Sequence, residues 1–148
     1  MRFKFALQKI VDLKKSEKTQ AEWVLAQSLG KLRAAEHSLN ELLMAKQTAQ
    51  AALMQSAQAK ATVSEIREKQ HFIEHLDKKI AEKSADVYRD RAAVEQNKSA
   101  LAVKMVDEKV WLGAKDRAYA RYLAKFFKAE QDQLDEMAAV RHQPGKNL

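Results

Sequence analysis

The chain has 148 residues, of which 46% are apolar, 32% are charged and 7% are aromatic. One proline, three glycines and no cysteine argue against a fold of short strands and loops, and exclude disulfides and thiolate metal sites. The net charge of +7 favours acidic partners, but the basic and acidic residues are interspersed, so we expect no nucleic-acid binding.

The hydropathy pattern argues against a membrane protein. No run of about eighteen apolar residues occurs, so we expect no membrane span. The first fifteen residues interleave Lys and Arg with apolar residues, unlike the continuous apolar core of a signal peptide. We therefore expect a cytoplasmic location.

Leucines recur through the first third of the chain at steps of three and four residues and their multiples. This spacing places side chains on one face of an α-helix. The stripe comprises Leu25, Leu29, Leu32, Leu39, Leu43 and Leu53, and Phe3, Leu7, Ile10 and Val11 begin a similar face upstream. We predict a first helix over about residues 3–57, with few large apolar residues between about Ala45 and Ala61.

A helix-start signal follows at Thr62, Val63, Ser64 and Glu65. In this capping box, the hydroxyl and the carboxylate satisfy free backbone amides at the first turn of a helix. We predict a chain reversal over about residues 58–62. A helix that continues straight through stays an alternative, since Ala and Gln favour helix.

The second helix carries apolar residues at six consecutive seven-residue intervals. They are Ile66, Ile73, Ile80, Val87, Val94 and Leu101, and Met105, Leu112, Tyr119 and Phe126 form a second such series. A strict seven-residue repeat is typical of a coiled-coil strand. The second seam position, expected four residues after each member of the first series, is polar: Gln70, Asp77, Ser84, Arg91 and Lys98.

These patterns predict an all-α fold, a long antiparallel two-helix coiled coil or helical hairpin. The second helix covers about residues 63–142, a flexible tail follows at 143–148, and residues 1–148 form one coiled-coil domain. Both chain ends then lie at the same end of the rod. A two-helix seam covers only part of the aromatic group Trp111, Tyr119, Tyr122, Phe126 and Phe127, so we expect it to serve both core packing and a partner.

We expect no enzyme activity. His71, Glu74 and His75 match the H-x-x-E-H signature of some zinc peptidases, but a helical rod offers no third ligand, open coordination position or substrate cleft. No glycine-rich phosphate loop is present. We assign no catalytic, cofactor-binding or metal-binding residues.

Three stretches together resemble the FliJ family, the small coiled-coil components of the bacterial flagellar type III export apparatus. They are Phe3 to Leu13 followed by Glu17 and Lys18, the central Phe72, Ile73, Leu76 and Ile80, and Gln133 to Ala138. The likeness runs over nearly the whole chain. It implies a two-helix coiled coil similar to the central stalk of rotary ATPases.

The resemblance also implies a function and partners. It implies a non-enzymatic stalk that enters the hexameric ring of the export ATPase FliI, contacts the export gate FlhA and handles export chaperones alongside the ATPase regulator FliH. Such a protein is cytoplasmic and peripheral to the inner face of the cell membrane at the flagellar base. Where the family can carry tyrosines, this chain has Ala45 and Ala49.

The resemblance implies two sets of binding residues. Matching by position gives gate-binding residues Leu42, Phe72 and Leu76. The paired chain ends give ring-binding residues Phe3, Phe5, Leu7, Leu123, Phe126, Phe127 and Leu134.

Three other functions stay open at the level of sequence. The chain could be the equivalent stalk of a virulence type III secretion system, which belongs to the same structural class. It could be a basic helical nucleic-acid-binding protein, or a coiled-coil scaffold that associates with itself.

Overall fold

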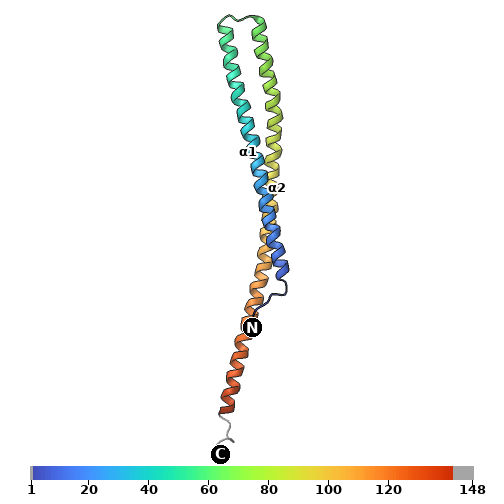
Figure 1. Ribbon diagram of the computed structural model, residues 1–148, viewed down its shortest axis with the longest axis vertical. Helices are drawn as coiled ribbons and strands as arrows, with labels where there is room; N and C mark the ends of the chain where they lie inside the picture. The colour runs from blue at the N-terminus through green and yellow to red at the C-terminus, as the bar shows by residue number, and fades with distance from the viewer. Residues whose placement is uncertain (1, 142–148) are drawn as a thin grey trace, which may run out of the picture. The chain divides into compact units, whose positions relative to one another are not determined.

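The computed structural model describes residues 2–141, and within that range it contains two long helices and no strand. α1 covers Gln8–Gln58 and α2 covers Val63–Arg141. The all-α helical hairpin predicted from the heptad pattern is therefore confirmed (Figure 1). The predicted tail at 143–148 lies outside the described residues. Between residues 2 and 141 no helix is both long enough and apolar enough to span a membrane.

α1 begins at Gln8, five residues after the start expected near residue 3. The first turn forms when the Gln8 amide donates to the Phe5 carbonyl at 3.1 Å and the Val11 amide donates to the Leu7 carbonyl at 3.2 Å. Phe3 stays outside the helix, and its ring packs against Tyr119 with the ring centroids 5.1 Å apart. This aromatic contact on α2 explains why the helical pattern of the first residues does not become helix.

The reversal between the helices is closed by a backbone motif. The Ala61 amide donates to the Ser56 carbonyl at 3.0 Å, the six-to-one bond of a Schellman helix end. Lys60 takes the left-handed conformation that this motif needs, with φ at 58°. α2 then starts at the predicted cap, because the Thr62 hydroxyl accepts a hydrogen bond from the Glu65 amide at 3.2 Å.

The chain groups into two compact units, which we describe separately. One unit comprises residues 19–102, and the other comprises the described residues of 1–18 and 103–148. Both helices run through both units. The single domain expected over residues 1–148 stays a prediction.

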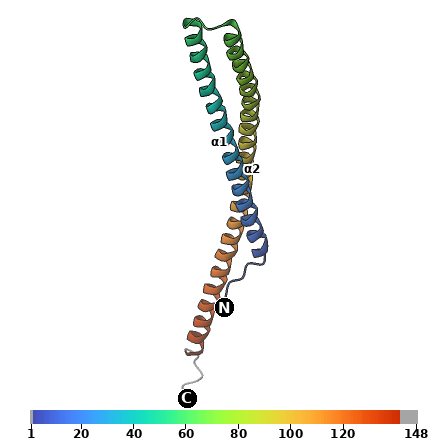
Figure 2. The ribbon, with the colours of Figure 1, turned by 45° about the horizontal axis from the view of Figure 1, so that its top comes forward.

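In the unit of residues 19–102, α1 and α2 lie antiparallel, as Figures 1 and 2 both show. The predicted α2 stripe faces the seam: Val87 and Val94 are buried, and Ile66, Ile73, Ile80 and Leu101 are partly buried. On α1 the partly buried leucines include Leu42, whereas Leu43 of the predicted stripe is 43% exposed.

The second seam position of α2 lies three residues after each stripe member, and the expectation of four residues is wrong. The residues at that expected position, from Gln70 to Lys98, are all exposed. Steps of three and four both return near the same helix face, so the side on which α1 packs decides which step is buried. The position is occupied by Lys69, Leu76, Lys83, Asp90, Asn97 and Lys104, of which Leu76 and Asp90 are buried. With so little apolar burial per heptad, we expect marginal stability in this unit.

In the unit of residues 1–18 and 103–148, ion pairs hold α1 to α2. Lys14 Nζ lies 2.9 Å from Asp107 Oδ2, and Lys18 Nζ lies 2.9 Å from Glu108 Oε1. The hydrogen bond to Asp107 raises the pKa of Lys14 above its ordinary value of 10.5, burial partly opposes this rise, and the charges of Asp107 and Glu17 add to it. Val11 is the buried apolar residue of α1 in this unit.

Candidate partner-binding sites

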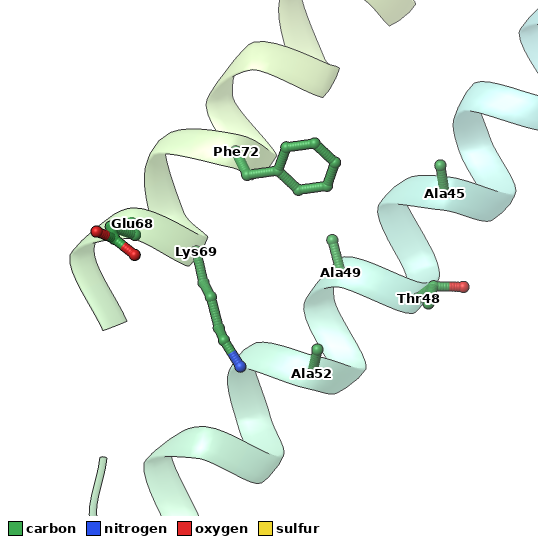
Figure 3. Close-up of a pocket in the computed structure, with 7 residues that line it drawn as sticks. All are labelled: Ala45, Thr48, Ala49, Ala52, Glu68, Lys69 and Phe72. Atoms are coloured by element: carbon green, nitrogen blue, oxygen red, sulfur yellow. The ribbon is translucent and has the colours of Figure 1, made fainter. Parts of the chain in front are cut away.

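The first candidate site is a groove between α1 and α2 in the unit of residues 19–102. It has a volume of about 550 Å³. The lining residues are Ala45, Thr48, Ala49, Ala52, Glu68, Lys69 and Phe72. Because alanine side chains end at Cβ, α1 leaves open the space toward which the Phe72 ring points (Figure 3).

Polar contacts bridge the two helices on either side of this groove along the chain. Lys69 donates from Nζ to the Ser56 hydroxyl, near the chain reversal. Lys46 and Asp77 form an ion pair at 2.6 Å. These contacts hold the two helices together. The groove surface between them is mostly apolar, because alanine side chains line its α1 side.

The three residues expected to bind the gate lie in different environments. Phe72 is 52% exposed and lines the groove, so its ring is available to a partner. Leu76 is buried between the helices, with 5% of its surface exposed. Leu42 is partly buried and, like Leu76, is not among the lining residues. Phe72 therefore offers the most accessible surface of the three.

The family resemblance singles out Ala45 and Ala49 on the α1 side of this groove, as positions where the family can carry tyrosines, but it predicts no groove there. The signal was present in the stretch rich in Ala and Gln that follows Ala45. Ala45, Ala49 and Ala52 are spaced by four and three residues, and therefore share one helix face. An alanine face opposite a partly exposed aromatic residue is the pattern that predicts a groove.

The second candidate site is an aromatic cluster in the unit of residues 1–18 and 103–148. Phe3 contacts Tyr119 and Tyr122, with centroid distances of 5.1 and 5.3 Å. Tyr122 lies 6.4 Å from Phe126, and Phe126 lies 5.8 Å from Phe127. Phe3, Phe126 and Phe127, three of the expected ring-binding residues, therefore belong to one continuous cluster. Phe5 and Leu123 are partly buried, and Leu7 is 42% exposed.

Beyond Leu123, every described residue of α2 is exposed, from Ala124 to Arg141. Phe127 and Leu134 are 59% and 60% exposed, and Met137 and Val140 are about half exposed. Large apolar side chains on an exposed helix are typical of a surface that a partner covers. Phe126 belongs to the same exposed stretch.

The histidine motif lies on an exposed helix surface. His71 Nδ1 is 3.5 Å from Glu74 Oε2, and both side chains are about 70% exposed. Within residues 2–141, no group of three His, Cys, Asp or Glu side chains is arranged to hold a metal ion. The motif therefore contributes to neither candidate site.

Known proteins resemble this chain in sequence and in fold. Residues 3–147 match the sequence profile of the family described as "Flagellar FliJ protein". The flagellar FliJ protein of Bacillus subtilis (strain 168) is 22% identical over 138 residues, which cover 93% of this chain and 94% of that protein. The solved structure of a proposed YscO homologue from Chlamydia trachomatis shares the fold, with a TM-score of 0.60, 18% identity and 96% of each chain covered. From the family match over nearly its whole length, we conclude that the chain belongs to the FliJ family.

Proposed function

We propose that this protein is a non-enzymatic stalk and adaptor of the bacterial flagellar type III protein-export apparatus. It promotes assembly of the export-ATPase ring, couples the ring to the export gate and escorts export chaperones. Family membership supports the flagellar assignment. The likeness to the proposed YscO homologue concerns the fold, which a virulence secretion stalk would share.

One observation carries the proposal most strongly. The protein has two separate candidate surfaces, one in each compact unit, and α1 and α2 pass through both units without a break. A protein that couples two partners needs two surfaces joined by a mechanically continuous element. Both surfaces include residues of α2, so both partners would bind parts of this one helix.

In this proposal, the cluster of Phe3, Phe126 and Phe127, together with Leu134, binds the ATPase ring. Phe126, Phe127 and Leu134 are exposed, and Phe3 is partly buried against Tyr119. Phe5, Leu7 and Leu123 are the remaining ring-binding residues: Phe5 and Leu7 closely follow Phe3 in the sequence, and Leu123 closely precedes Phe126. Burial of aromatic side chains in a partner is among the largest single contributions to affinity.

The alanine-lined groove with Phe72 binds the gate in this proposal. Leu76 is buried one helical turn after Phe72, and Leu42 is partly buried on α1. These partners place the protein in the cytoplasm, peripheral to the inner face of the cell membrane.

Paired binding measurements test the proposal. The ATPase and the cytoplasmic part of the gate protein, both from the same organism, are titrated separately against the wild type and two variants. We expect Phe126→Ala with Phe127→Ala to weaken ATPase binding by more than about tenfold and leave gate binding unchanged. We expect Phe72→Ala to do the reverse. Loss of both interactions in either variant, or of neither, would refute the assignment of two independent surfaces.

A further inference from the structure

A row of exposed valines lies on α2 in the unit of residues 1–18 and 103–148. Val103, Val106 and Val110 are spaced by three and four residues, so they share one helix face. They are 65%, 62% and 59% exposed. Valine is a poor helix former and gains little when exposed, so these residues do not serve the folding of α2.

The same face continues into a row of cations. Arg117 lies seven residues after Val110, and Arg121, Lys125 and Lys128 follow at steps of four, four and three residues. We call these seven residues the outer row: Val103, Val106, Val110, Arg117, Arg121, Lys125 and Lys128. At 1.5 Å per residue, the outer row extends for about 38 Å along the helix.

The cations of the outer row have no acidic partner in the described part of the chain. Other cations in the same unit do: Lys14 pairs with Asp107, Lys18 pairs with Glu108, and Lys104 pairs with Glu17. No ion pair between residues 2 and 141 involves Arg117, Arg121, Lys125 or Lys128. Four like charges on one helix face repel one another, and no ion pair within the described residues offsets this repulsion. Binding of an acidic partner would reduce it.

The outer row is distinct from the aromatic cluster. Tyr119 is two residues from both Arg117 and Arg121, a step that directs side chains to different faces of a helix. Gly113 lies on the outer row between Val110 and Arg117, where a Cβ atom would be 3.4 Å from Nη1 of Arg117. The Arg117 guanidinium therefore lies over Gly113, next to the valines of the outer row.

We propose that the outer row binds an acidic amphipathic helix of a partner protein. The apolar half of that helix packs on Val103, Val106 and Val110, and its Asp or Glu residues face the four cations. A helix of about 25 residues has the length of the outer row. The inference goes beyond the proposed function, because it adds a third binding surface that neither the ring nor the gate requires.

The charge order along α2 favours a protein helix over a uniformly anionic surface. Asp132 and Asp135 continue the same face at steps of four and three residues after Lys128. A lipid headgroup layer or a nucleic-acid backbone, negative throughout, would be repelled there. A helix with its own charge pattern can match both signs and is oriented by them.

The test uses the full-length chain and two labelled helical peptides of 25 residues. One peptide carries Leu at positions spaced to meet the valines and Glu at positions spaced to meet the cations. The other has the reversed sequence, so that parallel and antiparallel docking are both sampled. We expect one of the two to bind in a fluorescence-anisotropy titration, and its Glu→Gln version to bind more than about tenfold more weakly.

Variants of the chain assign the binding to the outer row. Arg121→Glu with Lys125→Glu reverses the charge of two of the four cations, and Val103→Gln, Val106→Gln and Val110→Gln together remove the apolar half without loss of helix propensity. We expect each variant to lower the affinity by more than about tenfold. Lys78→Glu with Lys79→Glu is the control, because it changes the net charge equally at exposed positions away from the outer row, and it should retain binding.

Four outcomes would overturn the proposal. The first is that neither peptide binds. The second is that the control variant loses as much affinity as the row variants, which indicates nonspecific charge attraction. The third is a dimer by sedimentation that the row variants dissociate, which makes a second copy the occupant. The fourth is loss of ATPase binding in the row variants, which assigns the outer row to the ring.

Discussion

The carboxylate of Asp90 on α2 is buried in the helix seam, and its Oδ1 atom lies 3.8 Å from Nζ of Lys31 on α1. Asp90 is 5% exposed, whereas the Lys31 side chain is 71% exposed. Val87 and Val94, the stripe residues on either side of Asp90, are also buried. A buried acid paired with a solvated cation contributes little stability but favours one register of the two helices.

Replacing Asp90 with leucine should therefore stabilise the protein. We expect Asp90→Leu to raise the free energy of unfolding by about 1–2 kcal/mol, because it removes a buried charge and adds apolar burial and helix propensity. Urea denaturation followed by circular dichroism measures the change. Glu95→Leu is the control, since the Glu95 side chain is 74% exposed, and it should stay within about 0.5 kcal/mol of the wild type. A destabilised Asp90→Leu would show that the carboxylate is a net stabilising element.

Lys60 sits in a conformation that suits glycine. Its φ of 58° closes the end of α1, and non-glycine residues are disfavoured there by about 1–2 kcal/mol. We expect Lys60→Gly to raise the melting temperature and to add about 0.5–1 kcal/mol of stability after the greater freedom of glycine in the unfolded chain is subtracted. Lys60→Ala keeps the Cβ atom and should show no such gain. Equal melting temperatures for all three proteins would argue that the reversal is not closed in this way.

Leu76 and Phe72 should respond differently to truncation, because one is buried and the other lines a groove. We expect Leu76→Ala to lower the free energy of unfolding by about 2–3 kcal/mol through the cavity it leaves. Phe72→Ala should cost less than about 1 kcal/mol, since half of the ring is already exposed. Thermal melts of the two variants in parallel measure the difference. Similar losses would place Phe72 in the core instead of on a partner surface.

The Lys14–Asp107 ion pair gives the stability a pH dependence at the alkaline end. The pKa of Lys14 is raised in the folded protein, so the pair stabilises the fold in full below the ordinary pKa of 10.5. That contribution is lost as the pH rises through the higher folded pKa. We expect the stability difference between the wild type and Lys14→Met to be constant near neutral pH and to shrink in strongly alkaline buffer. A difference that persists unchanged above the raised pKa would contradict a contribution from the ammonium charge.

The seven-residue repeat predicts the helices well and the details of the seam less well. The six stripe residues, from Ile66 to Leu101 at seven-residue intervals, are all buried or partly buried, as their spacing requires. The sequence predicts the second seam position four residues after each stripe member, one residue later than the structure shows. Steps of three and four residues cannot be distinguished until the position of the partner helix is known. Asp90 could not be recognised as buried for the same reason.

Local competition between interactions explains the other differences. Phe3 belongs to a helical pattern, yet its ring contacts Tyr119 and Tyr122, which are far away in sequence. Lys60 gives no sequence signal for a turn, since lysine is a good helix former. In the groove, Phe72 could be predicted as a binding residue and the alanines share a helix face by their spacing, but the space between them is defined only once α1 lies opposite α2.

The central claim is that this chain acts on an export-ATPase ring through the cluster of Phe3, Phe126 and Phe127. The most direct measurement is the ATP hydrolysis rate of the export ATPase from the same organism, alone and with increasing amounts of the chain. We predict that the wild type raises the rate and that Phe72→Ala raises it equally, whereas Phe126→Ala with Phe127→Ala leaves it at the basal level. A wild-type chain that leaves the rate unchanged, or a Phe126→Ala, Phe127→Ala variant that stimulates as the wild type does, would contradict the account.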